Sequence, residues 1–149
     1  VGVGGDPLVE MALESLPGRA LEEGVATREE LQQWFARVRS EVSKASLVPE
    51  AGGPVAHALS TLASALRLEE RGAAGVEVAG VEGALARAET LVHAGRLVEA
   101  ADVLEGHFAG SEGGRAAALW VQSVRDRVVV EQAAAMVSAH ATALNAGLA

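Results

Sequence analysis

The stretch that decides the fold reads Leu-Val-His-Ala-Gly-Arg-Leu-Val-Glu-Ala-Ala and covers residues 91–101. Good helix formers stand on both sides of one glycine, Gly95. Glycine commonly ends helices because it adopts a left-handed backbone conformation without strain. A helix that ends at Gly95 and another that begins at Arg96 leave room only for a tight turn. The stretch therefore predicts an antiparallel helical hairpin around Gly95.

Helical patterns continue on both sides of this hairpin. Thr27-Arg28-Glu29-Glu30 is a capping box, so we expect a helix from Thr27 to between Lys44 and Leu47. Asp6-Pro7 starts a short helix, and further helices are expected over residues 55–70, 81–94, 96–108 and 115–145. The long last helix should turn its apolar residues inward, namely Trp120, Val124, Val128, Ala135 and Ala139.

The composition agrees with a fold made of helices alone. Of the 149 residues, 31 are Ala, the best helix former, and only 3% are aromatic. The sequence has no Tyr, and its β-branched residues are mostly isolated, which argues against a β-sandwich or barrel. We predict an all-α helical bundle with the hairpin around Gly95 and a long C-terminal helix. Its regions should be short helices over 1–26, an amphipathic helix pair over 27–72 and a terminal bundle over 78–149.

Several functions are disfavoured by missing residue patterns. The chain has no Cys, and its net charge of −8 with a pI near 5.0 argues against general nucleic-acid binding. No nucleophile motif or phosphate-binding loop is present. The four histidines do not have metal-ligand spacing: His57, His93, His107 and His140. We therefore expect no catalytic, metal or cofactor site, and a function carried by protein-binding or membrane-binding surfaces.

One segment differs from the rest in charge. Residues 27–48 hold four Lys or Arg against three Glu, a net +1, whereas residues 1–26 and 49–149 sum to −4 and −5. The same segment carries the adjacent pair Trp34 and Phe35. From spacing alone two interpretations stay open. The pair belongs to the core, or it lies in a bilayer interface beside Arg and Lys.

The two ends of the chain raise separate expectations. The sequence begins with Val1 rather than Met, so we expect a piece of a longer protein. From Val128 to Ala149 the only formal charge is Glu131. This Ala-rich tail is not a convincing membrane span. It either packs on its own domain or needs a partner chain to cover it.

Three stretches, taken in order, resemble the C-terminal region of the mitofilin family, the core subunits of the MICOS complex at mitochondrial crista junctions. The first is residues 20–31 followed by Trp-Phe-Ala-Arg-Val over 34–38. The second is Leu-Ser-Thr-Leu-Ala-Ser-Ala-Leu over 59–66. The third is residues 91–101, then Leu104, Gly110, Trp120 and a helix with Gln132. Together they span most of the chain, roughly residues 16–144.

The resemblance implies a protein of the mitochondrial inner membrane whose C-terminal region faces the intermembrane space. It implies partners of two kinds, a CHCH-domain MICOS subunit and anionic inner-membrane lipids. We also expect a homo-oligomer, in which the helices of residues 27–70 could swap between chains. The lipid-binding candidates are Trp34, Phe35, Arg37, Val38, Arg39 and Lys44. The candidates for binding the partner protein are His93, Gly95, Leu97 and Trp120.

One position departs from the family pattern. The family often has Arg directly before the Phe, where this chain has Trp34. An interfacial Trp suits a membrane surface, and the electrostatic part then falls to Arg37, Arg39 and Lys44. The alternative function is a soluble tetratricopeptide-like adaptor that binds a peptide or helix, because residues 88–101 fit one helix-turn-helix of such an array. The chain holds no second copy of that unit.

Overall fold

A computed structural model describes residues 5–46 and 80–147, and within these ranges the chain is helical and contains no strand. Its helices are α1 (Pro7–Glu14), α2 (Gly18–Glu22), α3 (Arg28–Ser46), a helix over residues 80–93, α5 (Leu97–Phe108) and α6 (Glu112–Gly147). The prediction of an all-α fold with a long final helix is confirmed. The helix expected over residues 55–70 lies outside the described residues.

Gly95 closes the hairpin as the sequence predicts. Its φ of 75° is left-handed, its N–H donates to the Val92 carbonyl at 3.0 Å, and the Arg96 N–H donates to the Leu91 carbonyl at 2.8 Å. These two bonds form a Schellman motif, which satisfies carbonyls that the helix end would otherwise leave unpaired. The chain therefore reverses from the helix over 80–93 into α5 within the three residues 94–96.

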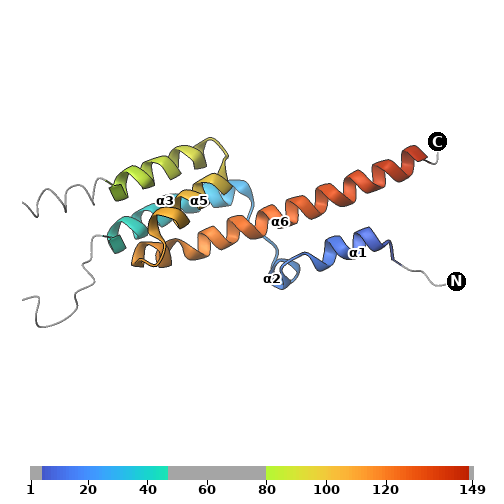
Figure 1. Ribbon diagram of the computed structural model, residues 1–149, viewed down its shortest axis with the longest axis horizontal. Coiled ribbons are helices and arrows are strands. Elements are labelled where there is room, and N and C mark those ends of the chain that lie inside the picture. The colour runs from blue at the N-terminus through green and yellow to red at the C-terminus, as the bar shows by residue number, and fades with distance from the viewer. Residues whose placement is uncertain (1–4, 47–79, 148–149) are drawn as a thin grey trace, which may run out of the picture.

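The bundle is formed by α3, the helix over 80–93, α5 and the first half of α6 (Figure 1). All four contribute to one hydrophobic core, so α3 shares its core with the terminal helices. Trp120 of α6 is fully buried at the centre, and its ring meets the ring of Phe35 edge-on at 5.1 Å between centroids. The Trp120 indole N–H donates to the Leu31 carbonyl at 2.9 Å. This bond satisfies the one polar atom of the ring and ties α6 to α3.

The second half of α6 continues beyond the bundle, where α1 lies beside it (Figure 1). We call this pair, α1 and residues 132–147 of α6, the arm. A 36-residue helix is about 54 Å long, so α6 belongs to both the bundle and the arm. Ala135 and Ala139 are exposed here. Their predicted inward orientation is wrong because the bundle ends before α6 does.

Candidate membrane and partner interfaces

The side of α3 that faces the bundle is fully occupied. Leu31, Phe35, Val38 and Val42 lie at helical spacing, and each is at most 2% exposed. Phe35 and Val38 were expected on the lipid-binding face. The structure places both in the core instead, because the apolar stripe of α3 packs against Trp120 and its neighbours. The core interpretation of Phe35 is confirmed, and neither side chain reaches a surface in this conformation.

The remaining lipid-binding candidates divide into two groups. Arg39 faces the helix over 80–93, where its guanidinium lies 3.4 Å from a Glu82 oxygen and 3.5 Å from a Glu89 oxygen. Its charge is therefore matched within the protein. Trp34 is half-buried against the rim of the core, whereas Arg37 and Lys44 are exposed.

Positions 34, 37 and 44 follow one another along a single side of α3, at helical spacings of three and seven residues. Neither Arg37 nor Lys44 has an ion pair with any residue that the structure describes. We call Trp34, Arg37 and Lys44 the outer face of α3. It offers an amphipathic ring at the rim of the core and two exposed cations beside it.

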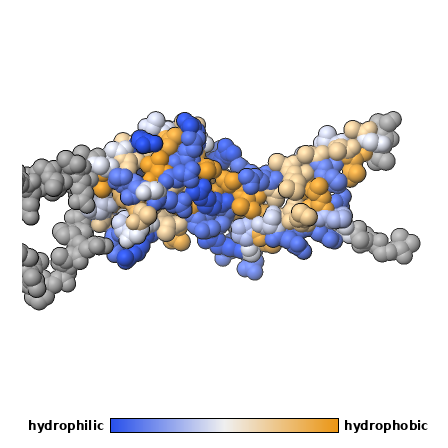
Figure 2. Space-filling view, in the orientation of Figure 1, coloured by the Kyte–Doolittle hydropathy of each residue, from blue (hydrophilic) through white to orange (hydrophobic). Residues whose placement is uncertain are grey.

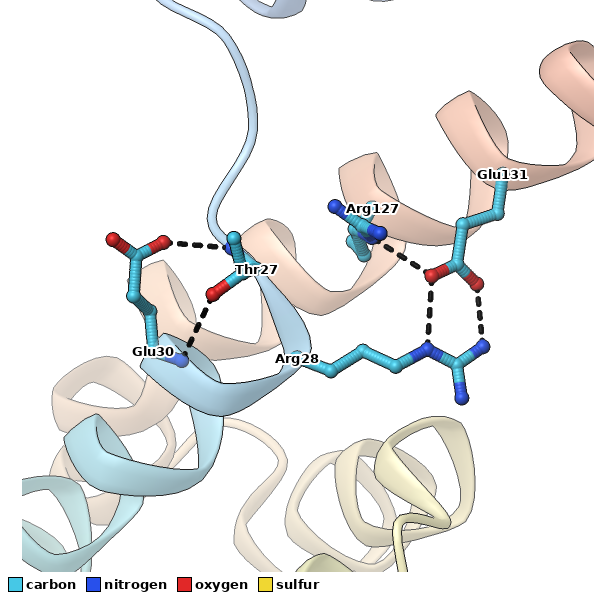
Figure 3. A network of polar contacts seen from close by, with 5 residues as sticks. All are labelled: Thr27, Arg28, Glu30, Arg127 and Glu131. Carbon is cyan, nitrogen blue, oxygen red and sulfur yellow. Dashed lines mark hydrogen bonds and ion pairs between the residues drawn. The ribbon is translucent and has the colours of Figure 1, made fainter.

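The N-terminus of α3 is fastened to the middle of α6 by an ionic clamp (Figure 3). Arg28 donates to both carboxylate oxygens of Glu131, at 2.9 and 2.6 Å, and Arg127 donates to the same carboxylate at 2.8 Å. Bonds from Arg28 and Arg127 lower the pKa of Glu131 to about 2. The capping box is present beside the clamp, since Thr27 and Glu30 exchange the two expected side-chain bonds. The clamp thus fixes the position at which α3 meets α6.

A second ion pair fastens α2 to the same helix. The Arg19 guanidinium donates to Asp126, the one buried charged residue in the described part of the chain. Burial raises the pKa of Asp126, but the bonds from Arg19 and Gln122 outweigh it and bring this pKa below its usual value. Neither ion pair could be predicted from the sequence. Arg28 and Glu131 are separated by 103 positions and Arg19 and Asp126 by 107, and such separations give no periodic signal.

The candidates for partner binding also divide between surface and core. Trp120 is fully buried and Leu97 is 7% exposed, so these two support the bundle from inside and do not reach a partner. His93 is exposed beside the turn at Gly95. The structure therefore leaves the hairpin turn, with His93, as the accessible part of the predicted partner-binding site.

Exposed apolar side chains gather on the arm. Large apolar side chains are exposed on both of its helices: Met11 and Leu13 on α1, Met136 and Leu144 on α6. Figure 2 shows hydrophobic colour along this outer part of the molecule. Between residues 132 and 147 α6 has no Lys, Arg, Asp or Glu. Within the described residues, its own domain thus covers the Ala-rich end of α6 only on the side where α1 lies.

Other kinds of site find no support in the described residues. No group of acidic and histidine side chains within residues 5–46 and 80–147 could hold a metal ion. Within the same ranges, no helix combines the length and the apolar character that crossing a bilayer requires. The described chain offers a bundle with one cationic outer face, an exposed hairpin turn and an apolar arm.

These features define an all-α bundle with a projecting arm, whose described residues include no group that could hold a metal ion. The comparisons with known proteins assign it more closely. The family model for mitofilin, described as a mitochondrial inner membrane protein, matches residues 3–142. The chain therefore belongs to the mitofilin family.

Its relatives include MIC60 subunits of the MICOS complex from a plant and from fungi. The Arabidopsis thaliana subunit is 31% identical over 94% of this chain and 21% of its own length. The Neurospora crassa subunit is 36% identical over 91% of this chain and 20% of its own length. The Coccidioides posadasii subunit is 38% identical over 65% of this chain and 14% of its own length. The chain thus spans about a fifth or less of these relatives, and no solved structure matches it.

Proposed function

We propose that this chain is a non-enzymatic scaffold domain of the MICOS complex. In this role it binds the mitochondrial inner membrane at crista junctions from the intermembrane space. Its membership of the mitofilin family and the names of its relatives, which are complex subunits, support this role. The observation that carries the lipid-binding part is the outer face of α3. A half-buried Trp beside two exposed cations suits the interface of an anionic bilayer.

The residues proposed to contact lipid differ from those expected from the sequence alone. Trp34, Arg37 and Lys44 make the contact, whereas Phe35 and Val38 hold α3 in the bundle. Binding then leaves the core intact, because the outer face is available without any opening of the bundle. Attraction to anionic lipid contributes roughly fivefold in affinity for each cation near the surface.

Two protein contacts complete the proposal. A CHCH-domain MICOS subunit docks at the hairpin turn, where His93 is exposed and Leu97 anchors the turn from below. A second copy of the chain pairs with the arm. Its exposed Met136 and Leu144 lie on a stretch of α6 without a formal charge, so two copies can meet there without like-charge repulsion.

Co-sedimentation with vesicles tests the lipid-binding face. The chain is mixed at low salt with phosphatidylcholine vesicles that contain or lack cardiolipin. We expect the native chain to sediment only with the cardiolipin vesicles. The double variant Arg37→Glu, Lys44→Glu should lose at least about tenfold in affinity, because two attractions become repulsions. The matched control is Arg87→Glu, Arg115→Glu, which makes the same change in net charge at exposed positions of other helices.

The control decides how a loss of binding is interpreted. If both double variants lose binding equally, the effect follows net charge and the outer face of α3 is not the contact. If the α3 variant sediments like the native chain, its face does not bind lipid. Circular dichroism of every variant at 222 nm checks that helicity is kept.

A tetratricopeptide-like adaptor remains the second candidate, favoured by one observation. An open depression of about 640 Å³ lies between the helix over 80–93 and α5, lined by Arg87, Thr90, Arg96 and Asp102 among others. A groove with both charge signs suits an extended peptide. No sedimentation at low salt, together with saturable binding of a short peptide that Arg87→Glu abolishes, would support the adaptor instead.

A further inference from the structure

Both methionines of the chain lie exposed on the arm. The sequence contains two Met residues, Met11 on α1 and Met136 on α6, and they are 65% and 47% exposed. Methionine is flexible and polarizable, so it fills gaps in cores and also serves at surfaces that adapt to a binding partner. Neither Met11 nor Met136 belongs to the core of the bundle. Their use is therefore at the surface of the arm.

The two helices of the arm run antiparallel, which brings the methionines to the same level. Asp6, just before α1, lies 2.6 Å from His140. The helix α2, which follows α1, is fastened to α6 at Asp126, so the chain order of these contacts is opposite on the two sides. Met11 lies about five positions after Asp6, and its neighbour on α6 therefore lies about five positions before His140, close to Met136.

The methionines also lie on the same side of this helix pair. Ala12 of α1 and Ala133 of α6, 2% and 7% exposed, mark where the two helices face each other. Met11 is rotated by about −100° from Ala12, and Met136 by about −60° from Ala133. Rotations of equal sign turn both side chains of an antiparallel pair to one side, whereas Leu13, at about +100°, lies on the other. We call the surface of Met11 and Met136 the methionine side of the arm.

Negative charge without a partner borders this surface. Glu10 and Glu14 are exposed on α1, and neither forms an ion pair with any residue within 5–46 and 80–147. They are neighbours at an i, i+4 spacing, where like charges repel, and Glu14 lies beside Met11 at i, i+3. Glu14 also stands in the last turn of α1, which has no basic residue, so its charge opposes the helix dipole. We call Glu10 and Glu14 the acidic border; a cation from outside would relieve both repulsions.

We propose that the methionine side of the arm docks a basic amphipathic helix of another protein. The apolar stripe of that helix lies on the two methionines, and its Lys or Arg residues face the acidic border. An anionic bilayer does not fit this surface, because the same carboxylates repel it. The arm and the outer face of α3 thus take partners of opposite charge. The inference goes beyond the proposed pairing of two copies and does not require it.

The methyl resonances of the two methionines report this docking directly. The chain is labelled with methionine that carries 13C in its methyl group, and the two signals are assigned with Met11→Leu and Met136→Leu. It is titrated with a synthetic peptide of Leu and Lys, about 18 residues long, patterned as an amphipathic helix. We expect both signals to shift to saturation, and a Leu and Glu peptide of the same pattern to leave them unchanged. No shift with the Lys peptide would overturn the inference, and so would equal shifts with both peptides, which report apolar adhesion alone.

Charge reversal on α1 tests the acidic border. The double variant Glu10→Lys, Glu14→Lys should bind the Lys peptide at least about tenfold more weakly, because two attractions become repulsions. The matched control is Glu29→Lys, Glu41→Lys, which makes the same change in net charge at exposed positions of α3 and should bind within about twofold of the native chain. Equal losses in the two variants would show that binding follows net charge, against the inference. Circular dichroism at 222 nm, without peptide, checks that each variant keeps its helicity.

Dilution of the labelled chain separates this docking from pairing of two copies. A Met136 signal that moves on dilution without peptide reports self-association through the arm. If that signal moves on dilution while the Lys peptide shifts neither methionine, a second copy is the occupant and the inference is wrong. If the peptide shifts both signals of a chain that dilution leaves unchanged, the inference stands and pairing through the arm is refuted.

Discussion

Replacing Phe35 by Ala distinguishes a core residue from a lipid-binding residue. The Phe35 side chain is 2% exposed and meets Trp120 edge-on at 5.1 Å, inside a core that all four bundle helices form. Removing a buried Phe side chain costs about 3–5 kcal/mol, which includes the lost contacts and the cavity left behind. Because the free energy of unfolding of a domain of this size is about 5–15 kcal/mol, the variant should still fold in buffer, with a much smaller free energy of unfolding.

Urea unfolding followed by circular dichroism at 222 nm measures this loss. With a denaturant slope of about 2 kcal/mol per molar, a loss of about 4 kcal/mol lowers the midpoint by about 2 M. Trp34→Ala is the neighbouring control. Trp34 is only half-buried, so its truncation should cost about 1–2 kcal/mol while weakening vesicle binding. Phe35→Ala, measured below its unfolding transition, should bind cardiolipin vesicles as the native chain does.

The opposite pattern would refute this assignment. If Phe35→Ala loses less than about 1 kcal/mol of stability and abolishes vesicle binding, the ring lies on a lipid-binding surface and the packing against Trp120 is not the relevant one. Phe35→Leu should give a loss of stability between those of the native chain and Phe35→Ala. It keeps most of the buried area and should cost about 1–2 kcal/mol.

Two further predictions concern the turn before α6 and the ionic clamp. A Cβ on Gly114 would lie 2.2 Å from the Phe108 carbonyl oxygen, so Gly114→Ala should destabilise the domain by about 2 kcal/mol or more. Gly83 lies on an open helix surface, so Gly83→Ala should stabilise the domain by about 0.5–1 kcal/mol in the same urea assay. Equal effects of the two changes would contradict the close approach at Gly114. The lowered pKa of Glu131 contributes stability that is complete above its ordinary value near 4.5 and is lost as pH falls toward about 2. Glu131→Gln should therefore lower the free energy of unfolding by roughly 1 kcal/mol at pH 7. Between pH 5 and pH 2 the variant should lose less stability than the native chain. An unchanged dependence of stability on acid pH would show that the Arg28 clamp is not formed.

The helices of the described residues could be predicted because their signals are local. The capping box at Thr27 and the glycine at 95 each lie within a few residues of the helix end that they determine. The helical period of α3 likewise places Leu31, Phe35, Val38 and Val42 on one stripe. It could not say whether the stripe meets protein or lipid, because both environments select the same apolar residues.

The candidate sites were harder to predict because exposure is set by packing between distant segments. Trp120 was assigned to partner binding, but its surroundings come from α3, which lies about 90 positions earlier in the sequence. The sequence indicated that Arg39 is available to bind lipid, but in the fold Glu82 and Glu89 of the helix over 80–93 lie beside it. Likewise, no sequence pattern shows that α1 packs near residue 140. The accessible outer face of α3 is therefore smaller than the sequence suggests.

The continuity of α6 gives the domain the mechanics of a lever. Its first half is held in the bundle and its last 16 residues project past Glu131 for about 24 Å. A tilt of α6 by about 10° displaces its tip by about 4 Å relative to Glu131. The same helix carries Trp120 in the core and Met136 and Leu144 on the arm, so the packing of α6 in the bundle sets the direction in which these exposed side chains project.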